Sequence, residues 1–361
     1  MVSPVLHWDV FCRVVDNYGD VGVCWRLARD LAERGQRVRL WLDDRSVLAW
    51  MAPAGAPGVE VCDWNEPLRE CEPGDVVIEA FGCSLPEAWL RRMAARQPAP
   101  RWINLEYLSA EPYVERSHGL RSPQFSGSAA GLDKWFFYPG FTSRTGGLIR
   151  EPRLLEEQAE FDRAAWLAGH GIAPAPGERV VTLFCYDNPV LPDVLSNFSQ
   201  TPCLLLAAPG AAAKQLTSLL GPDMRLGALR AQLLPLLTQT EFDRLLWASD
   251  LNFVRGEDSF VRAQWAGRPF VWQIYPQHDL AHAAKMDAFL DLYLASASPA
   301  LAADTRAFWR TWNGMQAWPQ QGFDIWRLIE EHRPLVRQWR EQLLTQTDLC
   351  TQLLTFISKT S

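Results

Sequence analysis

The sequence lacks the features that mark several large classes of protein. No apolar run reaches the about 18 residues that a membrane-spanning helix needs, and His7, Asp9 and Arg13 interrupt the apolar start, which argues against a secretory leader. Basic residues are not in excess: 35 Lys and Arg stand against 42 Asp and Glu, for a net charge of −7. That balance disfavours a nucleic-acid or anionic-membrane partner. We therefore expect a cytoplasmic protein that binds neither nucleic acid nor membrane.

Common cofactor and metal motifs are also missing. There is no G-x-x-x-x-G-K-[ST] and no G-x-G-x-x-G, which disfavours a P-loop NTPase and an ordinary dinucleotide dehydrogenase. The cysteines form no C-x-x-C pair, so a zinc ribbon or a disulfide framework is disfavoured, and reduced, mostly buried thiols are expected. The eight cysteines stand at positions 12, 24, 62, 71, 83, 185, 203 and 350.

What is present is a strand–helix alternation that occurs twice in the 361 residues. It predicts two α/β domains with parallel sheets, at 1–171 and 179–339, joined by the linker I-A-P-A-P-G-E (172–178). A long helical tail follows at 324–357, and its last part, about 340–361, is expected to pack back on the first domain. Two Rossmann-like halves and a C-terminal helical segment suggest the GT-B glycosyltransferase architecture, with the active site in the cleft between the domains. The expected strands are 5–15, 38–42, 59–64, 75–81, 101–108, 179–186, 202–208, 250–255 and 269–275, and the expected helices before the tail are 21–34, 45–51, 86–95, 153–170, 210–220, 241–248 and 257–266.

The most informative stretch is V-D-N-Y-G-D-V-G, residues 15–22. It joins the first predicted strand to the first predicted helix, and ligands of parallel sheets bind at such strand-to-helix turns. Asp20 has a simpler interpretation as the N-cap of a helix that begins near Val21. Asp16 lies too far upstream to cap the same helix. Two carboxylates in one turn suggest a site that handles a cation or takes up a proton.

A second turn of this kind is F-V-R-G-E-D-S-F, residues 253–260. The N-terminus of the helix that follows suits a phosphate, Arg255 offers a fork of donors, and Gly256 allows close backbone approach. Glu257 suits hydroxyl groups of a ribose or sugar better than a phosphate. The alternative is structural: Asp258 and Ser259 only cap the helix, and Arg255 pairs with Glu257 on the surface.

Two further segments have more than one interpretation. Phe184 and Tyr186 have the same parity on a strand, so they point to one face and either stack on a nucleobase or simply pack; the same ambiguity applies to Phe242. His278 and His282 are four residues apart, as in two-histidine zinc helices, but a third ligand is missing and Pro276 makes the segment a turn.

Three long motifs resemble one family specifically. They are W-D-V-F-C-R-V-V-D-N-Y-G-D-V-G-V-C-W-R-L-A-R-D-L (8–31), F-D-R-L-L-W-A-S-D (242–250) and R-G-E-D-S-F-V-R-A-Q-W-A-G-R-P-F-V-W-Q-I-Y-P-Q (255–277). They closely resemble the bacterial protein-arginine rhamnosyltransferases (EarP-type) that modify translation elongation factor P, and the resemblance extends over essentially the whole chain.

The resemblance implies a metal-independent, inverting GT-B enzyme that needs no cofactor and moves L-rhamnose from dTDP-β-L-rhamnose to an arginine of the N-terminal domain of elongation factor P. By that likeness Asp20 is the general base and Asp16 a second essential acid. Asn17, Tyr18 and Gly19 of the same turn are expected to contact substrate. Glu257 is counted with the two aspartates among the catalytic residues and is also expected to help hold the ribose and diphosphate. The residues implied for the donor are Phe184, Tyr186 and Phe242 around thymidine, Arg255, Gly256, Asp258 and Ser259 at the ribose and diphosphate, Gln239 in the nucleotide site and Gln277 near the sugar.

Alternatives remain open at this stage. One is a GT-B transferase with a small-molecule or lipid acceptor, which an acceptor screen would reveal. Another is a metallohydrolase built on His278 and His282, which metal analysis would decide. A third is a sensor that binds the nucleotide sugar without turning it over.

Overall fold

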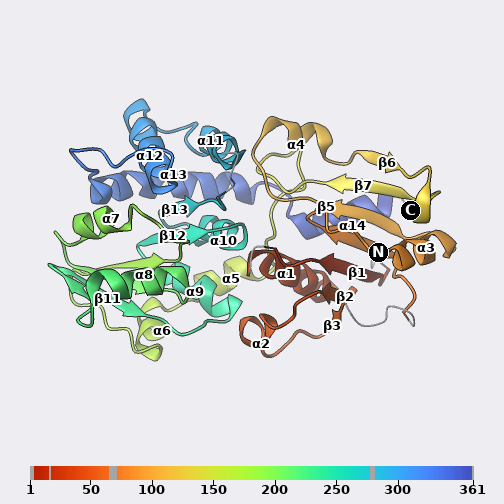
Figure 1. Ribbon diagram of the computed structural model, residues 1–361, viewed down its shortest axis with the longest axis horizontal. Coiled ribbons are helices and arrows are strands. Elements are labelled where there is room, and N and C mark those ends of the chain that lie inside the picture. Colours follow the sequence, from red (N-terminus) through yellow and green to blue (C-terminus); the bar gives the residue numbers. More distant parts are fainter. Residues whose placement is uncertain (1–3, 16–17, 65–70, 277–280, 360–361) are drawn as a thin grey trace. The chain divides into compact units, whose positions relative to one another are not determined.

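The computed structural model describes residues 4–15, 18–64, 71–276 and 281–359, and the chain divides into two compact units. The first unit comprises Met1–Leu154 and Gln346–Ser361, and the second comprises Leu155–Thr345. Each unit contains one largely parallel sheet with helices beside it (Figure 1). Such sheets are typical of chains in which strands and helices alternate.

The seven-stranded sheet of the first unit has the strand order β3-β2-β1-β4-β5-β7-β6, and all pairs are parallel except β6 with β7. Its elements are β1 (His7–Cys12), α1 (Gly19–Glu33), β2 (Arg37–Leu42), α2 (Leu48–Met51), β3 (Val59–Asp63), β4 (Val76–Ala80), α3 (Glu87–Ala95), β5 (Arg101–Leu105), α4 (Pro112–Ser117), β6 (Arg121–Pro123), the 3₁₀ turn η2 (Gly127–Ala129), β7 (Asp133–Phe137) and α14 (Leu349–Lys359).

Strand β1 is buried on both faces, as central strands of parallel sheets are. Trp8, Val10 and Cys12 face a core shared with α1 and α14, whereas Phe11 lies in a second core with Trp89 of α3. The sheet therefore lies between two helical layers, and the ends of its strands are left for loops.

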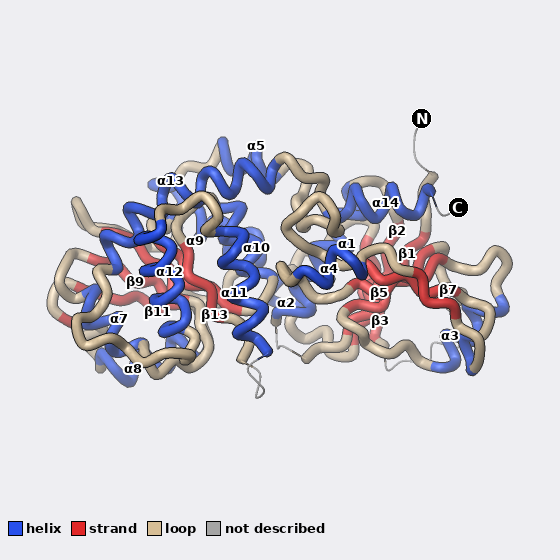
Figure 2. The backbone as a smooth tube through the Cα atoms, turned by 90° about the horizontal axis from the view of Figure 1, so that it is seen from above, coloured by secondary structure: helices blue, strands red, loops and turns tan. Residues whose placement is uncertain are grey.

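The six-stranded sheet of the second unit has the order β10-β11-β9-β8-β12-β13, with only β10 and β11 antiparallel among the described pairs. Figure 2 shows its strands among the surrounding helices. The elements are α5 (Leu154–Ala159), α6 (Arg163–Gly169), β8 (Arg179–Leu183), α7 (Leu191–Phe198), β9 (Cys203–Ala207), α8 (Ala211–Leu220), β10 (Arg225–Leu226), β11 (Leu229–Leu233), α9 (Gln239–Ala248), β12 (Leu251–Arg255), α10 (Asp258–Ala266), β13 (Phe270–Gln273), α11 (Ala281–Tyr293), α12 (Pro299–Trp312) and α13 (Ile325–Leu344).

The helix expected over 153–170 is two helices, α5 and α6. Asp162 ends the continuity because its carboxylate caps α6 by accepting a hydrogen bond from the backbone N–H of Ala165, 3.0 Å away. Helix α6 belongs to the second unit, where Trp166 donates to Glu241 (2.6 Å) and Arg163 to the carbonyl of Ala248 (2.6 Å). The two units thus divide at Leu154 rather than near residue 171.

The expected tail helix is likewise divided. Helix α13 ends at Leu344 in the second unit, and α14 begins at Leu349 in the first unit, where Leu349 and Leu353 join the core beside α1. No helix of the described ranges is both long and apolar enough to cross a bilayer. The cysteines form no disulfide in the described part of the chain, and six of the eight are buried.

Candidate active site

Asp20 is buried at the first turn of α1. The helix begins at Gly19 with Tyr18 as N-cap, and Asp20 is 3% exposed. Its Oδ2 accepts a hydrogen bond from the backbone N–H of Val15, 2.9 Å away. That N–H precedes the helix, so the alternative in which Asp20 serves as the N-cap is wrong. The carboxylate closes the turn between β1 and α1 instead.

The structure describes only some of the other residues of this turn. Asp16 and Asn17 lie outside the described residues. The ring of Tyr18 packs edge-on against Trp50, with centroids 5.2 Å apart, and Gly19 is the first, half-buried residue of α1. The structure therefore anchors the turn at Tyr18 and Asp20.

Two aromatic residues that the sequence analysis does not single out lie at the ends of neighbouring strands. Phe81 follows β4 and Tyr107 follows β5, and their rings stack with centroids 4.4 Å apart and an interplanar angle of 16°. The Tyr107 hydroxyl lies 3.4 Å from Oδ1 of Asp20. The only signal in the sequence was that both residues lie near the ends of predicted strands, Phe81 as the last residue of 75–81 and Tyr107 within 101–108. Their meeting with Asp20 depends on the sheet order β1-β4-β5.

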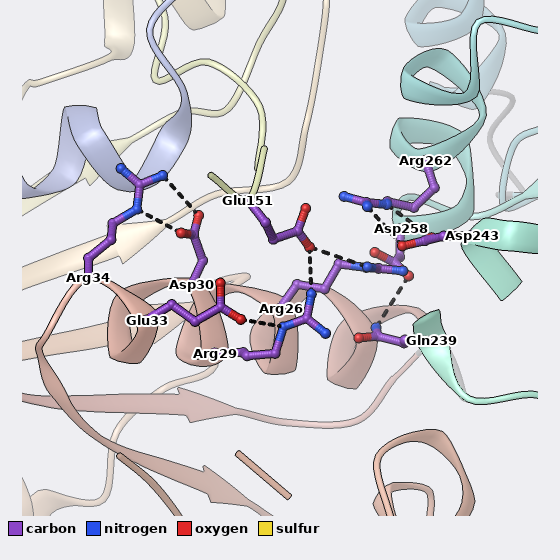
Figure 3. A network of polar contacts seen from close by, with 10 residues as sticks. All are labelled: Arg26, Arg29, Asp30, Glu33, Arg34, Glu151, Gln239, Asp243, Asp258 and Arg262. Carbon is purple, nitrogen blue, oxygen red and sulfur yellow. Dashed lines mark hydrogen bonds and ion pairs between the residues drawn. The ribbon is translucent and has the colours of Figure 1, made fainter. Parts of the chain in front are cut away.

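Helix α1 is held in place by ion pairs of Arg26 and Arg29, which lie beyond the first turn of the helix. Arg26, 1% exposed, contacts Oε1 of Glu151 at 3.4 Å, and Arg29 contacts the same oxygen at 3.0 Å (Figure 3). Removing one partner of a buried pair leaves an uncompensated charge, which is costly. These contacts fix the helix whose first turn carries Asp20.

The second turn joins β12 to α10. Gly256 has φ +63°, the left-handed region that glycine adopts without steric cost. Ser259 is buried, and its hydroxyl donates to the carbonyl of Arg255 and accepts from the Arg255 N–H at 3.2 Å. Helix α10 begins at Asp258 with Glu257 as N-cap and no side-chain cap. Neither Asp258 nor Ser259 is therefore the N-cap of this helix, and the turn is closed by hydrogen bonds between Ser259 and Arg255.

The guanidinium of Arg255 lies over two aromatic rings. Its central carbon is 4.5 Å from the ring centroids of both Phe184 and Tyr186, close enough for cation–π attraction. Strand β8 ends at Leu183, so the two residues follow the strand instead of lying on it as predicted, and both rings nevertheless contact Arg255. Phe242 of α9 meets Phe184 edge-on at 5.3 Å. Three aromatic rings and a cation thus gather at the carboxyl ends of β8 and β12.

Polar side chains also join the two helices next to this cluster, α9 and α10. The amide Nε2 of the buried Gln239 donates to Oδ2 of Asp258 at 3.4 Å (Figure 3). Deeper in the unit, Arg262 forms a two-pronged pair with Asp243 at 3.0 and 2.8 Å. Bidentate geometry of this kind fixes orientation as well as distance. The N-terminus of α10 is consequently held rigidly against α9.

The thiols at both turns are protonated. Burial raises the pKa of Cys24 well above its ordinary value, with further contributions from Cys12 and from the charge of Asp20. Burial likewise raises the pKa of Cys185, between Phe184 and Tyr186, to about 12. A thiolate is the nucleophilic form of cysteine. Neither thiol therefore serves as a nucleophile at neutral pH.

Gln277 and His278 lie outside the described residues, so their expected roles stay predictions. His282 is buried within α11. Within the described ranges, no group of three or more His, Cys, Asp or Glu side chains is arranged to hold a metal ion.

Comparison with known proteins decides the family. The sequence profile of the family described as Elongation-Factor P (EF-P) rhamnosyltransferase EarP matches residues 8–358. The chain belongs to this family. It is 44% identical over 374 residues to a protein-arginine rhamnosyltransferase of Pseudomonas aeruginosa, which covers 97% of this chain and 98% of the relative. It is 45% identical to the protein of the same name from Pseudomonas putida, again over 97% and 98%.

Solved structures agree. A structure described as the basis for EarP-mediated arginine glycosylation of translation elongation factor EF-P superposes with a TM-score of 0.65 and 33% identity, over 99% of this chain and 100% of that chain. The spinosyn rhamnosyltransferase SpnG superposes with a TM-score of 0.54 at 14% identity, over 98% and 100%, which shows the fold alone. The α/β fold of GT-B class expected from the sequence is confirmed.

Proposed function

We propose that this protein is an inverting, metal-independent glycosyltransferase that moves L-rhamnose from dTDP-β-L-rhamnose to an arginine side chain of elongation factor P. The observation that carries the proposal is the 44% identity, across 97% of the chain, to a relative named protein-arginine rhamnosyltransferase. The two strand-to-helix turns supply the chemistry that such a reaction needs. Asp20 is the acid of the first turn, and Arg255 is the cation of the second.

The second unit is the donor site in this proposal. Thymine lies against the rings of Phe184, Tyr186 and Phe242, while Arg255, Gly256 and Ser259 face the diphosphate. The cation–π contacts of Arg255 with two of these rings support the assignment, because they bring a positive charge beside a flat apolar platform. Glu257, Asp258 and Gln239 bind hydroxyl groups of the ribose or the sugar.

The first unit acts on the acceptor. A guanidinium has a pKa above about 12, so it is protonated and a poor nucleophile. Transfer requires a carboxylate that orients the group and takes a proton as the nitrogen forms its new bond. Asp20 accepts this proton, and Asp16 polarises and orients the guanidinium. The burial of Asp20 supports the role, because low local dielectric strengthens its attraction for the cation.

The reaction balances as a single displacement. The guanidino nitrogen forms a bond to C1 of rhamnose while the bond from C1 to the diphosphate oxygen breaks, and the electron pair leaves with dTDP. The proton of the attacking nitrogen passes to Asp20. Attack opposite the leaving group inverts the β-linked donor to an α-linked product. Arg255 and the positive N-terminal end of α10 stabilise the charge on the departing diphosphate.

The experiment that tests the proposal is the intact mass of elongation factor P after incubation with this protein and dTDP-β-L-rhamnose. We expect a gain of one deoxyhexose. Reactions without the donor or with dTDP alone are the controls. An unchanged mass with an enzyme that still binds dTDP would contradict the proposal and favour a different acceptor or a sensor.

A further inference from the structure

Among the described residues, the Asp20 carboxylate is contacted by donors from two different parts of the first unit. The backbone N–H of Val15 donates to Oδ2 at 2.9 Å, and the hydroxyl of Tyr107 lies 3.4 Å from Oδ1. One donor belongs to the turn that contains Asp20, whereas the other comes from the loop after β5. A carboxylate bound at both oxygens has a fixed plane and one fixed set of remaining lone pairs. Hydrogen bonds at catalytic groups are often long without substrate and shorten in the reacting complex.

Tyr107 is itself positioned by Phe81. The two rings are stacked at 4.4 Å, and Tyr107 is 37% exposed, so one part of its ring stays accessible beside Asp20. Stacked aromatic pairs restrict each other's orientation beyond simple burial.

The position of the Phe81 ring depends on a strained backbone conformation. Phe81 has φ +57°, a left-handed conformation that bulky residues rarely adopt. Its N–H donates to the carbonyl of Leu105 at 2.7 Å, and the N–H of Gly82 donates to Oδ1 of Asn104 at 3.2 Å. Strained residues persist where the surroundings over-determine them and are concentrated at functional sites. Both hydrogen bonds reach β5, so they tie the position of Phe81 to the strand that ends just before Tyr107.

We propose that Tyr107 is a positioning residue for proton transfer at Asp20, and that Phe81 holds Tyr107 in place. The inference rests on the proposed function, in which Asp20 accepts the guanidinium proton. The hydroxyl of Tyr107 donates to the ionised carboxylate, keeps its own proton throughout, and orients the carboxylate toward the acceptor nitrogen.

The test is Tyr107→Phe in the full-length protein, which keeps the stacked ring and removes only the hydroxyl. With elongation factor P and dTDP-β-L-rhamnose as substrates, we expect kcat to fall about tenfold, the loss expected for one hydrogen bond to a charged group. KM for either substrate should stay unchanged.

Tyr113→Phe is the matched control, since Tyr113 is an exposed tyrosine of α4 in the same unit whose ring meets Tyr138. It should leave kcat and both KM values unchanged. Phe81→Leu removes the stacking partner while keeping an apolar side chain, and it should lower kcat in the same direction as Tyr107→Phe. Thermal melts and dTDP titration establish that each variant is folded.

An active wild type together with a Tyr107→Phe variant of unchanged kcat would overturn this inference and leave the proposed function standing. A raised KM at unchanged kcat would also overturn it, because Tyr107 would then bind substrate instead of orienting Asp20. If the wild type transfers no rhamnose to elongation factor P, the proposed function fails and this inference fails with it.

Discussion

At the scale of single residues, the account depends on what surrounds the ionised groups of the two turns. Asp20 lies where the N-terminal end of α1 favours negative charge, and its carboxylate accepts a hydrogen bond from the N–H of Val15. Arg255 lies against apolar rings, where its charge is less screened than in water. The surroundings of Asp20 thus suit a cationic partner, and the charge of Arg255 suits an anionic one.

Replacing Asp20 with Asn tests the base. The amide has nearly the same shape but takes up no proton, so turnover should fall by about 10²–10⁴-fold. Affinity for dTDP should stay close to that of the wild type, because the residues proposed to bind the donor are in the second unit. Rate measurements and calorimetry on the same preparation give both numbers. A rate near that of the wild type would contradict the assignment.

Replacing Arg255 with Ala tests the donor site. Loss of a charged hydrogen-bonding partner is worth roughly 1.5–3 kcal/mol, so affinity for dTDP should fall by about 10- to 150-fold. Glu257→Ala should also weaken binding. The control is Arg244→Ala on α9, which removes an arginine that pairs with Glu241 at the surface. Unchanged affinity in both site variants would show that the turn is only structural.

At the scale of elements, α12 and α13 meet at a buried histidine. His332 of α13 is 4% exposed, and its Nε2 lies 2.7 Å from Oγ1 of Thr305 on α12. The Thr305 hydroxyl donates to the carbonyl of Leu301 at 2.6 Å, so Nε2 of His332 is the donor to Thr305. Burial lowers the pKa of His332 to about 4.

This histidine makes stability depend on pH. In the unfolded chain this histidine binds a proton with the ordinary pKa of about 6.5. The contribution of His332 to the free energy of unfolding is therefore fully present above pH 6.5 and is lost as the pH falls toward 4. The loss amounts to up to about 3 kcal/mol of unfolding free energy. Denaturant unfolding between pH 7 and pH 4 should show it, and His332→Gln should flatten the slope. Equal slopes in both proteins would contradict the assignment.

The alternation of strand and helix patterns was sufficient to predict both sheets and most of their helices. It missed β6 and β10, which have three and two residues and therefore no readable periodicity, and also the five-residue strands β7 and β11. The same pattern missed the helices α4, α7, α11 and α12. Both turns were found from sequence because their polar residues are contiguous. Tyr107 was missed because its proximity to Asp20 arises only when β5 lies beside β4 and β4 beside β1.

At the scale of the whole molecule, each unit has its own sheet and core, and the proposed reaction needs residues of both. A transferase of this kind meets a protein acceptor whose arginine must be extended and desolvated. Holding an arginine side chain in one conformation costs up to about 2 kcal/mol. A rigid loop on a folded domain reduces that cost and adds docking surface.

We therefore expect the isolated N-terminal domain of elongation factor P to be modified well and a linear peptide with the same arginine to be modified poorly. The measurement is kcat/KM for each acceptor at saturating donor. A scrambled-sequence peptide controls for nonspecific transfer. Equal kcat/KM values for the domain and the matched peptide would mean that the enzyme recognises only the sequence around the arginine.

The measurement that tests the central claim most directly is fragmentation mass spectrometry of elongation factor P after reaction with dTDP-β-L-rhamnose. It should be run with the wild type, with EDTA-treated wild type and with Asp20→Asn. The account predicts one deoxyhexose on a single arginine side chain, the same product after chelation, and almost none with Asp20→Asn. A sugar on any other residue, no sugar with the wild type, or a product that EDTA abolishes and a divalent metal restores would contradict it.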